Sequence, residues 1–146
     1  MGYFNDDEAR SRQIILEHYE EPDNKIENVD DYKEYKSFNN KSSSCIDNLT
    51  LYLHIDNENI IKDVKFSGMG CAISTSSTDI VCSMILNKNK NDALKIIDEY
   101  FKMIDGLEYD ETVLETLSIF KNISKQLNRI KCAKVGVVAI KEIIAN

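Results

Sequence analysis

Cysteine thiols are the most reactive side chains in this 146-residue sequence, and they stand at positions 45, 71, 82 and 132. Four dispersed thiols are too few for the disulfide framework of a small secreted domain. Such dispersed cysteines are more typical of metal binding or thiol chemistry in a reducing compartment. We therefore expect the cysteines to carry the function.

Cys45 and Asp47 lie two residues apart, directly before a segment predicted to be a strand. On an extended chain this spacing sends both side chains to the same side, where a thiolate and a carboxylate can share one metal ion. A pair of this kind also arises often by chance. It therefore becomes a candidate metal site only if further ligands join it.

Cys71 follows Gly68-Met69-Gly70 and falls on the first turn of a predicted helix, whose free N–H groups stabilise a thiolate. Cys132 lies on the last predicted helix. Taken alone, each is more simply a buried cysteine that packs as a small apolar residue. Cys82 lies nearly three helical turns beyond Cys71, about 16 Å along the axis, so we expect a core thiol outside any shared site.

The N-terminal third of the chain is predicted to be one helix followed by a polar segment. Apolar residues recur at helical spacing over residues 6–20, and the pattern ends before Pro22. Residues 23–44 are polar, and their last part, 41–44, is predicted to be a mobile loop that delivers Cys45.

Two segments with a period of two predict an antiparallel hairpin. Apolar side chains occupy alternate positions over residues 49–55, and the alternation resumes over residues 60–66 after a turn-forming stretch. His54 falls on the outward face of the first strand, so we expect a solvated or covered histidine there and not a metal ligand.

Segments with helical periodicity follow the hairpin and supply the cover for its apolar face. They are residues 71–87, residues 94–104, a shorter segment around 113–117, and a last segment from about Arg129. A hairpin followed by helices predicts an α+β sandwich in which a small antiparallel sheet packs against several helices. The length suits one domain, residues 1–146.

Composition and charge exclude several kinds of partner and location. The net charge of −7 repels nucleic acid backbones and anionic lipid head groups, so neither is an expected partner. No apolar run approaches the roughly 18 residues of a membrane span, and the N-terminus lacks the basic start and apolar stretch of a secretory signal. We expect a cytoplasmic protein.

Taken together, the motifs resemble the IscU/NifU-like iron–sulfur cluster assembly family over nearly the whole chain. The resemblance rests on the order and spacing of three blocks and on an entry helix similar to the family's His-Tyr-x-x-Pro-x-Asn, here from His18 to Asn24. The blocks are Cys45-x-Asp47, Gly68-x-Gly70-Cys71-Ala72-Ile73-Ser74 and Arg129-Ile130-Lys131-Cys132-Ala133. Within the family, His18 would be a structural residue.

Three features are similar to the SufU branch of that family. The chain has one proline, so it lacks the scaffold branch's Leu-Pro-Pro-Val-Lys motif, and Lys131 stands where that branch has a histidine. The long interval from Cys71 to Cys132 also resembles the SufU branch. Where the family usually has glycine between its first cysteine and the aspartate, this chain has Ile46.

The resemblance implies a zinc-dependent sulfurtransferase that accepts persulfide sulfur from a cysteine desulfurase of the SufS type and passes it to a downstream acceptor. It implies Zn²⁺ bound by Cys45, Asp47, Cys71 and Cys132. Cys45 would be the sulfur acceptor, and Arg129 would contact the desulfurase or steady the anionic site.

Two alternatives use the same ligands. The first is an iron–sulfur cluster assembly scaffold that holds a transient [2Fe–2S] cluster, since thiolates bind iron clusters as readily as zinc. The second is a structural zinc domain that serves as a protein-interaction module.

Overall fold

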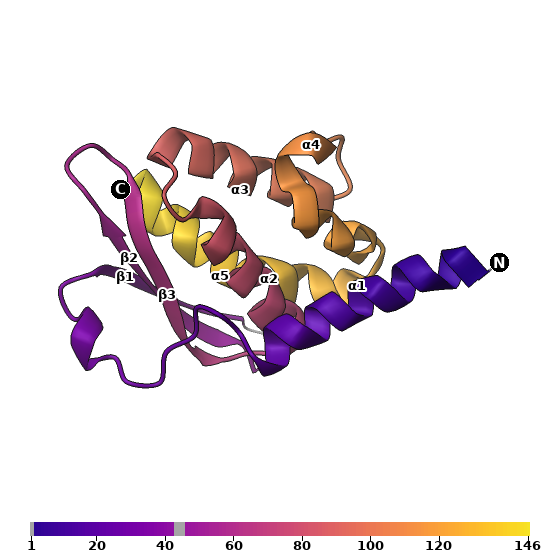
Figure 1. The fold of residues 1–146 in the computed structure, drawn as a ribbon, viewed down its shortest axis with the longest axis horizontal. Helices are drawn as coiled ribbons and strands as arrows, with labels where there is room; N and C mark the ends of the chain where they lie inside the picture. The colour runs from indigo at the N-terminus through magenta and orange to yellow at the C-terminus, as the bar shows by residue number, and fades with distance from the viewer. Residues whose placement is uncertain (1, 43–45) are drawn as a thin grey trace.

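The fold comes from a computed structural model that describes residues 2–42 and 46–146. Helices and strands alternate little along the chain: one helix, then a sheet, then a run of helices (Figure 1). The elements are α1 (Gly2–Glu20), η1 (Asp30–Tyr32), β1 (Lys36–Lys41), β2 (Asn48–Ile55), β3 (Ile61–Met69), α2 (Ala72–Ile85), α3 (Lys90–Ile104), α4 (Glu111–Leu114), η2 (Glu115–Lys125) and α5 (Leu127–Ala145), where η denotes a 3-10 helix.

The sheet has the order β1-β2-β3, with both pairs antiparallel. Leu49, Leu51 and Leu53 of β2 are fully buried, while His54 on the other face is exposed. The alternation in the sequence therefore predicted both the β2–β3 hairpin and its buried face.

Strand β1 was not predicted, because Lys36–Lys41 is a polar segment without alternation. It forms because β2 offers it a full antiparallel ladder, from Lys36 opposite Leu53 to Lys41 opposite Asn48. Lys41, expected in a loop, is thus the last residue of a strand. Pairing with a neighbour decides strand formation here, not side-chain pattern.

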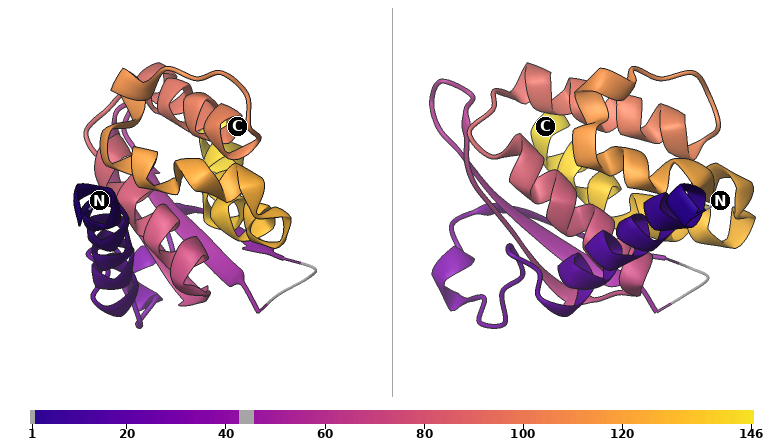
Figure 2. Two further views of the ribbon diagram at one scale, coloured as in Figure 1. Left: turned by 90° about the vertical axis from the view of Figure 1, so that its right-hand side faces the viewer. Right: turned by 45° about the vertical axis from the view of Figure 1, so that its right-hand side comes forward.

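The helices form a layer on one face of the sheet. Helix α5 packs on β1 and β2, α2 packs on β3, and the two helices pack on each other (Figure 2). Helices α3 and η2 lie behind them, and α1 packs along α2. The molecule therefore has the predicted α+β architecture, and its apolar core fills the space between sheet and helices.

Some helix boundaries differ from the sequence expectation. Helix α1 begins at Gly2 instead of residue 6, α2 ends at Ile85, and α5 begins at Leu127. The short helix expected around 113–117 is α4 followed by the 3-10 helix η2. The buried residues of η2 recur at every third position, which is the period of a 3-10 helix: Leu117, Phe120 and Ile123.

None of the helices within residues 2–42 and 46–146 is both long and apolar enough to cross a membrane.

Candidate metal centre

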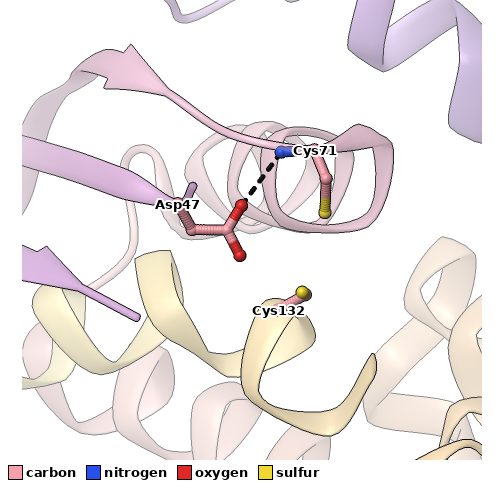
Figure 3. A group of neighbouring side chains, drawn as sticks. All are labelled: Asp47, Cys71 and Cys132. Carbon is pink, nitrogen blue, oxygen red and sulfur yellow. Dashed lines mark hydrogen bonds between the residues drawn. The ribbon is translucent and has the colours of Figure 1, made fainter. Parts of the chain in front are cut away.

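Three of the four residues expected to bind metal converge in the structure. Asp47 directly precedes β2, Cys71 directly precedes α2, and Cys132 lies in the second turn of α5. One carboxylate oxygen and the two sulfur atoms lie within 4.8 Å of one another (Figure 3). Asp47 and Cys132 are buried, and Cys71 is partly exposed.

Asp47 is held by two hydrogen bonds to the same oxygen. The backbone N–H of Cys71 donates to Oδ1 over 3.0 Å, and the Ser74 hydroxyl donates to it over 2.9 Å. The other carboxylate oxygen points toward the space between the two thiols in Figure 3. A carboxylate that is 1% exposed is costly to bury unless donors or a cation compensate its charge.

Cys71 is the N-cap residue of α2. Its backbone is extended, and its sulfur accepts a hydrogen bond from the N–H of Ser74 at 3.5 Å. A thiolate at a helix N-terminus is stabilised by the unpaired N–H groups and by the helix dipole. The predicted setting of Cys71 is therefore the observed one.

Hydrogen bonds to α3 and β1 fix the part of α5 that carries Cys132. The Tyr100 hydroxyl donates to the Ala133 carbonyl over 2.8 Å, and the side-chain amide of Asn40 donates to the Val135 carbonyl over 2.9 Å. Burial raises the pKa of the Tyr100 hydroxyl well above its ordinary value, so it remains a donor to higher pH than an exposed tyrosine would. Cys132 consequently sits on a rigid part of the fold.

The donor set suits a soft or borderline metal ion. Two thiols and one carboxylate provide three anionic ligands when ionised, and thiolate-rich sites select zinc or iron–sulfur clusters over magnesium or calcium. Zn²⁺ is usually four-coordinate in such sites, so one further ligand is required.

Cys45, the expected fourth ligand, lies outside the described residues. Asp47 follows it by two positions, and the N–H of Ser42 donates to the Asp47 carbonyl over 2.9 Å. Arg129, in the first turn of α5, and Lys131, just before Cys132, both have exposed side chains.

Cys82 is fully buried in the apolar core. It does not belong to either candidate metal-binding group found among the described residues. Burial, followed by the nearby charge of Asp79, raises the pKa of its thiol well above the ordinary value. Its expected role as a core thiol therefore agrees with its position in α2.

A second group of potential ligands joins α1 to α2. Nδ1 of His18 lies 2.6 Å from Oδ2 of the fully buried Asp79, and the N–H of Asp23 donates to the same oxygen over 3.2 Å. Oδ1 of Asp79 accepts from the backbone and side-chain amides of Asn24 at 2.9 and 3.0 Å. Because donors already occupy both oxygens, this cluster is best described as a structural anchor, in line with the expectation for His18.

Sequence reasoning missed two residues, Ser74 beside the candidate metal centre and Asp79 in the buried anchor. Ser74 was quoted only as the end of the Cys71 motif, and Asp79 was not singled out. Both lie in the run of six polar residues 74–79, which covers every side of the first half of α2 and is buried throughout. A polar run of this length within a helix is the signal that marks both, because buried polar groups need partners.

Comparisons with known proteins agree with this fold. Residues 10–146 match the family model for the NifU-like N terminal domain, so the chain belongs to that family of iron–sulfur cluster assembly proteins, which includes IscU and SufU.

Two curated relatives illustrate its two branches. The chain is 33% identical over 135 residues to the zinc-dependent sulfurtransferase SufU of Bacillus subtilis, covering 92% of this chain and 88% of the relative. It is 33% identical over 102 residues to the iron–sulfur cluster assembly scaffold protein IscU of Thermotoga maritima, covering 70% of this chain and 71% of the relative.

A solved structure shares the fold. It is that of a putative iron–sulfur cluster assembly scaffold protein for the SUF system from Fervidobacterium islandicum. The two chains superpose with a TM-score of 0.77 at 32% identity, covering 90% of this chain and 93% of the other.

Proposed function

We propose that this protein is a zinc-dependent sulfurtransferase that accepts sulfur from a cysteine desulfurase of the SufS type. The observation that carries the proposal is the convergence of Asp47, Cys71 and Cys132, next to a lysine at position 131. Lys131 stands where the scaffold branch has a histidine, and a protonated lysine offers no lone pair to a metal.

Cys45 is proposed as the fourth ligand. Two residues of extended chain span about 7 Å, so its position two residues before Asp47 keeps it within reach of the three converging donors. With four protein ligands the site has no place for a substrate water, which makes hydrolytic chemistry a poor fit. When bound, zinc would hold the thiolates together and lower their pKa values.

The proposed chemistry is an exchange between two sulfur atoms. The thiolate of Cys45 attacks the terminal sulfur of the desulfurase persulfide, a new bond forms between these two sulfurs, and the bond to the enzyme's cysteine breaks. The enzyme's cysteine leaves as a thiolate with the electron pair, so no oxidant or reductant is consumed. A downstream acceptor thiol can then take the sulfur by the same step. Such free thiols persist in a reducing compartment, so the proposal includes a cytoplasmic location.

Three exposed apolar side chains stand close in the sequence to the converging ligands and suit a docking partner. Ile46, Met69 and Leu127 are the most exposed large apolar side chains in the described part of the chain, at 65, 64 and 83%. Ile46 stands one position before Asp47, Met69 two positions before Cys71, and Leu127 five positions before Cys132. We call these three residues the apolar rim. Ile46 and Met69 also line an open groove of about 930 Å³. Exposed apolar residues that cluster at a reactive site favour a protein partner.

Arg129 is proposed to act at this interface. Its exposed guanidinium lies one helical turn before Cys132, where it can pair with a carboxylate of the desulfurase. The same charge can also offset the anionic ligand set.

The first alternative is an assembly scaffold whose cargo is a transient [2Fe–2S] cluster. It is favoured by the match to the Thermotoga relative and by the affinity of thiolates for iron clusters. Anaerobic purification distinguishes the two functions: a colourless protein with one zinc supports sulfur transfer, and a brown protein with stoichiometric iron and sulfide supports the scaffold.

The second alternative, a structural zinc module for protein interaction, predicts that Cys45→Ala lowers stability without any separate defect in sulfur transfer.

Mass spectrometry after mixing with a cysteine desulfurase and cysteine tests the transfer directly. The peptide that contains Cys45 should gain one sulfur, about 32 Da, and the protein should raise cysteine turnover. Cys45→Ala should abolish both effects, whereas Cys82→Ala should keep both and serves as the matched control. Sulfur found on Cys132 alone, with Cys45→Ala still active, would overturn the acceptor assignment. No sulfur on any peptide would overturn the function.

Charged substitutions test the apolar rim. Ile46→Asp, Met69→Asp and Leu127→Asp should each weaken binding to the desulfurase about 10-fold or more. Leu107→Asp is the control, because Leu107 is similarly exposed, at 61%, but lines another groove beside α3. Equal effects at Leu107 and at the rim would contradict the assignment of this surface.

A further inference from the structure

Ser74 contacts two of the proposed metal ligands from a position of complete burial. Its hydroxyl donates to Oδ1 of Asp47 at 2.9 Å, and its backbone N–H donates to the sulfur of Cys71 at 3.5 Å. Ser74 is 0% exposed. Bulk water therefore has no direct access to this hydroxyl.

The hydroxyl has two acceptors and only one hydrogen. The Cys71 carbonyl lies 3.2 Å away, farther than the Asp47 carboxylate, and a charged acceptor forms the stronger hydrogen bond. The carboxylate bond is therefore the main one. Together with the N–H of Cys71, this bond holds Oδ1, and the opposite oxygen faces the thiols in Figure 3.

The local backbone is shaped so that this hydroxyl can reach Asp47. A Cβ atom on Gly70 would lie 2.4 Å from Oγ of Ser74. Any side chain at position 70 would thus push against the Ser74 hydroxyl. Because Gly70 has no side chain, the Ser74 hydroxyl can lie in the space next to it.

From this geometry we propose that Ser74 is a positioning residue of the metal centre, which fixes Asp47 so that a single carboxylate oxygen is presented to the ion. The inference rests on the proposed metal site. Without the Ser74 hydroxyl, Oδ1 loses one of the donors described above and the carboxylate is held less firmly. Hydrogen-bond partners of metal ligands commonly contribute to affinity in this way.

Ser74→Ala is the central test, because it removes the hydroxyl and keeps the backbone N–H that reaches Cys71. Zinc affinity, measured by competition with a chromophoric chelator, should fall about 10- to 100-fold. The visible spectrum of the Co²⁺-substituted protein, which depends on ligand geometry, should change with it. Unchanged zinc affinity together with an unchanged Co²⁺ spectrum would overturn the proposal.

Ser76→Ala is the matched control. Ser76 is equally buried on the same helix, but its hydroxyl donates to the Ala72 carbonyl at 2.6 Å and not to a ligand. Its loss should leave both metal readouts unchanged. Ser74→Thr keeps the hydroxyl and should restore most of the affinity. A loss in Ser76→Ala as large as in Ser74→Ala would mean that α2 is merely destabilised, which also overturns the proposal.

A double-mutant cycle separates this inference from the metal site on which it rests. If Ser74 acts through Asp47, adding Ser74→Ala to Asp47→Ala should weaken zinc binding no further. Fully additive losses would overturn the role of Ser74. If Asp47→Ala itself binds zinc as tightly as the unmodified protein, Asp47 is not a ligand and the proposed metal site fails first.

Discussion

Gly136 in α5 lies directly against Thr78 in α2, so closely that a Cβ atom at position 136 would overlap the Thr78 side chain. Gly136 stands one helical turn beyond Cys132, and Thr78 stands two turns beyond Cys71. The distance between the two helices at this contact therefore controls how closely the two thiols approach. The Thr78 hydroxyl is fixed in turn, since it donates to the Ser74 carbonyl over 2.7 Å.

Gly136→Ala should consequently disturb both stability and metal binding. Forcing a methyl group into this contact should cost about 1–3 kcal/mol of the free energy of unfolding, measured by urea denaturation. Zinc affinity should fall as well, because the thiols move apart. Thr78→Ala in the same chain should recover part of both losses, and a Gly136→Ala variant with normal stability would contradict the close contact.

Removing the metal should destabilise the protein by several kcal/mol, since structural zinc contributes about 10–16 kcal/mol in small zinc-binding peptides. The buried carboxylate of Asp47 and the thiols would lose the cation that compensates their charge. Calorimetry of the chelator-treated and reloaded forms measures the difference. An apo protein that melts at the same temperature as the loaded one would exclude this metal centre.

Cys82 should be dispensable for metal binding and slow to react. Its thiol is fully buried and its pKa is raised, so the neutral form dominates to higher pH than for an exposed thiol, and the nucleophilic thiolate is scarce. Iodoacetamide should label Cys82 only after unfolding, as judged by peptide mass spectrometry. Cys82→Ala should keep full zinc content at a cost of about 1 kcal/mol, and near-zero zinc in that variant would refute the ligand assignment.

The buried anchor at Asp79 should matter far more to stability than an exposed ion pair of similar length. Asp79→Asn weakens the contacts with His18 and Asn24 in the interior and should cost about 3 kcal/mol. Asp98→Asn, which removes the exposed pair with Lys141 at 2.7 Å, should cost less than about 0.5 kcal/mol. Urea denaturation of both variants at pH 7 gives the comparison, and equal losses would contradict the role of Asp79.

Local features of this protein could be predicted from the sequence because they depend on near neighbours. The alternation over residues 49–55 determined which face of β2 is buried. The glycines before Cys71 marked a turn into a helix, and the two-residue spacing marked Asp47 as a candidate ligand. In each case the period of a strand or the start of a helix sets the side-chain direction.

Only the tertiary structure determined which of these local features come together in space. Strand β1 carries no pattern of its own and exists through its ladder with β2. Cys132 approaches Cys71 because Gly136 lets α5 lie close to Thr78 of α2. Ser74 meets Asp47 because the start of α2 packs beside the start of β2. These relationships depend on residues far apart in the sequence, and helical or strand periodicity carries no information about such distances.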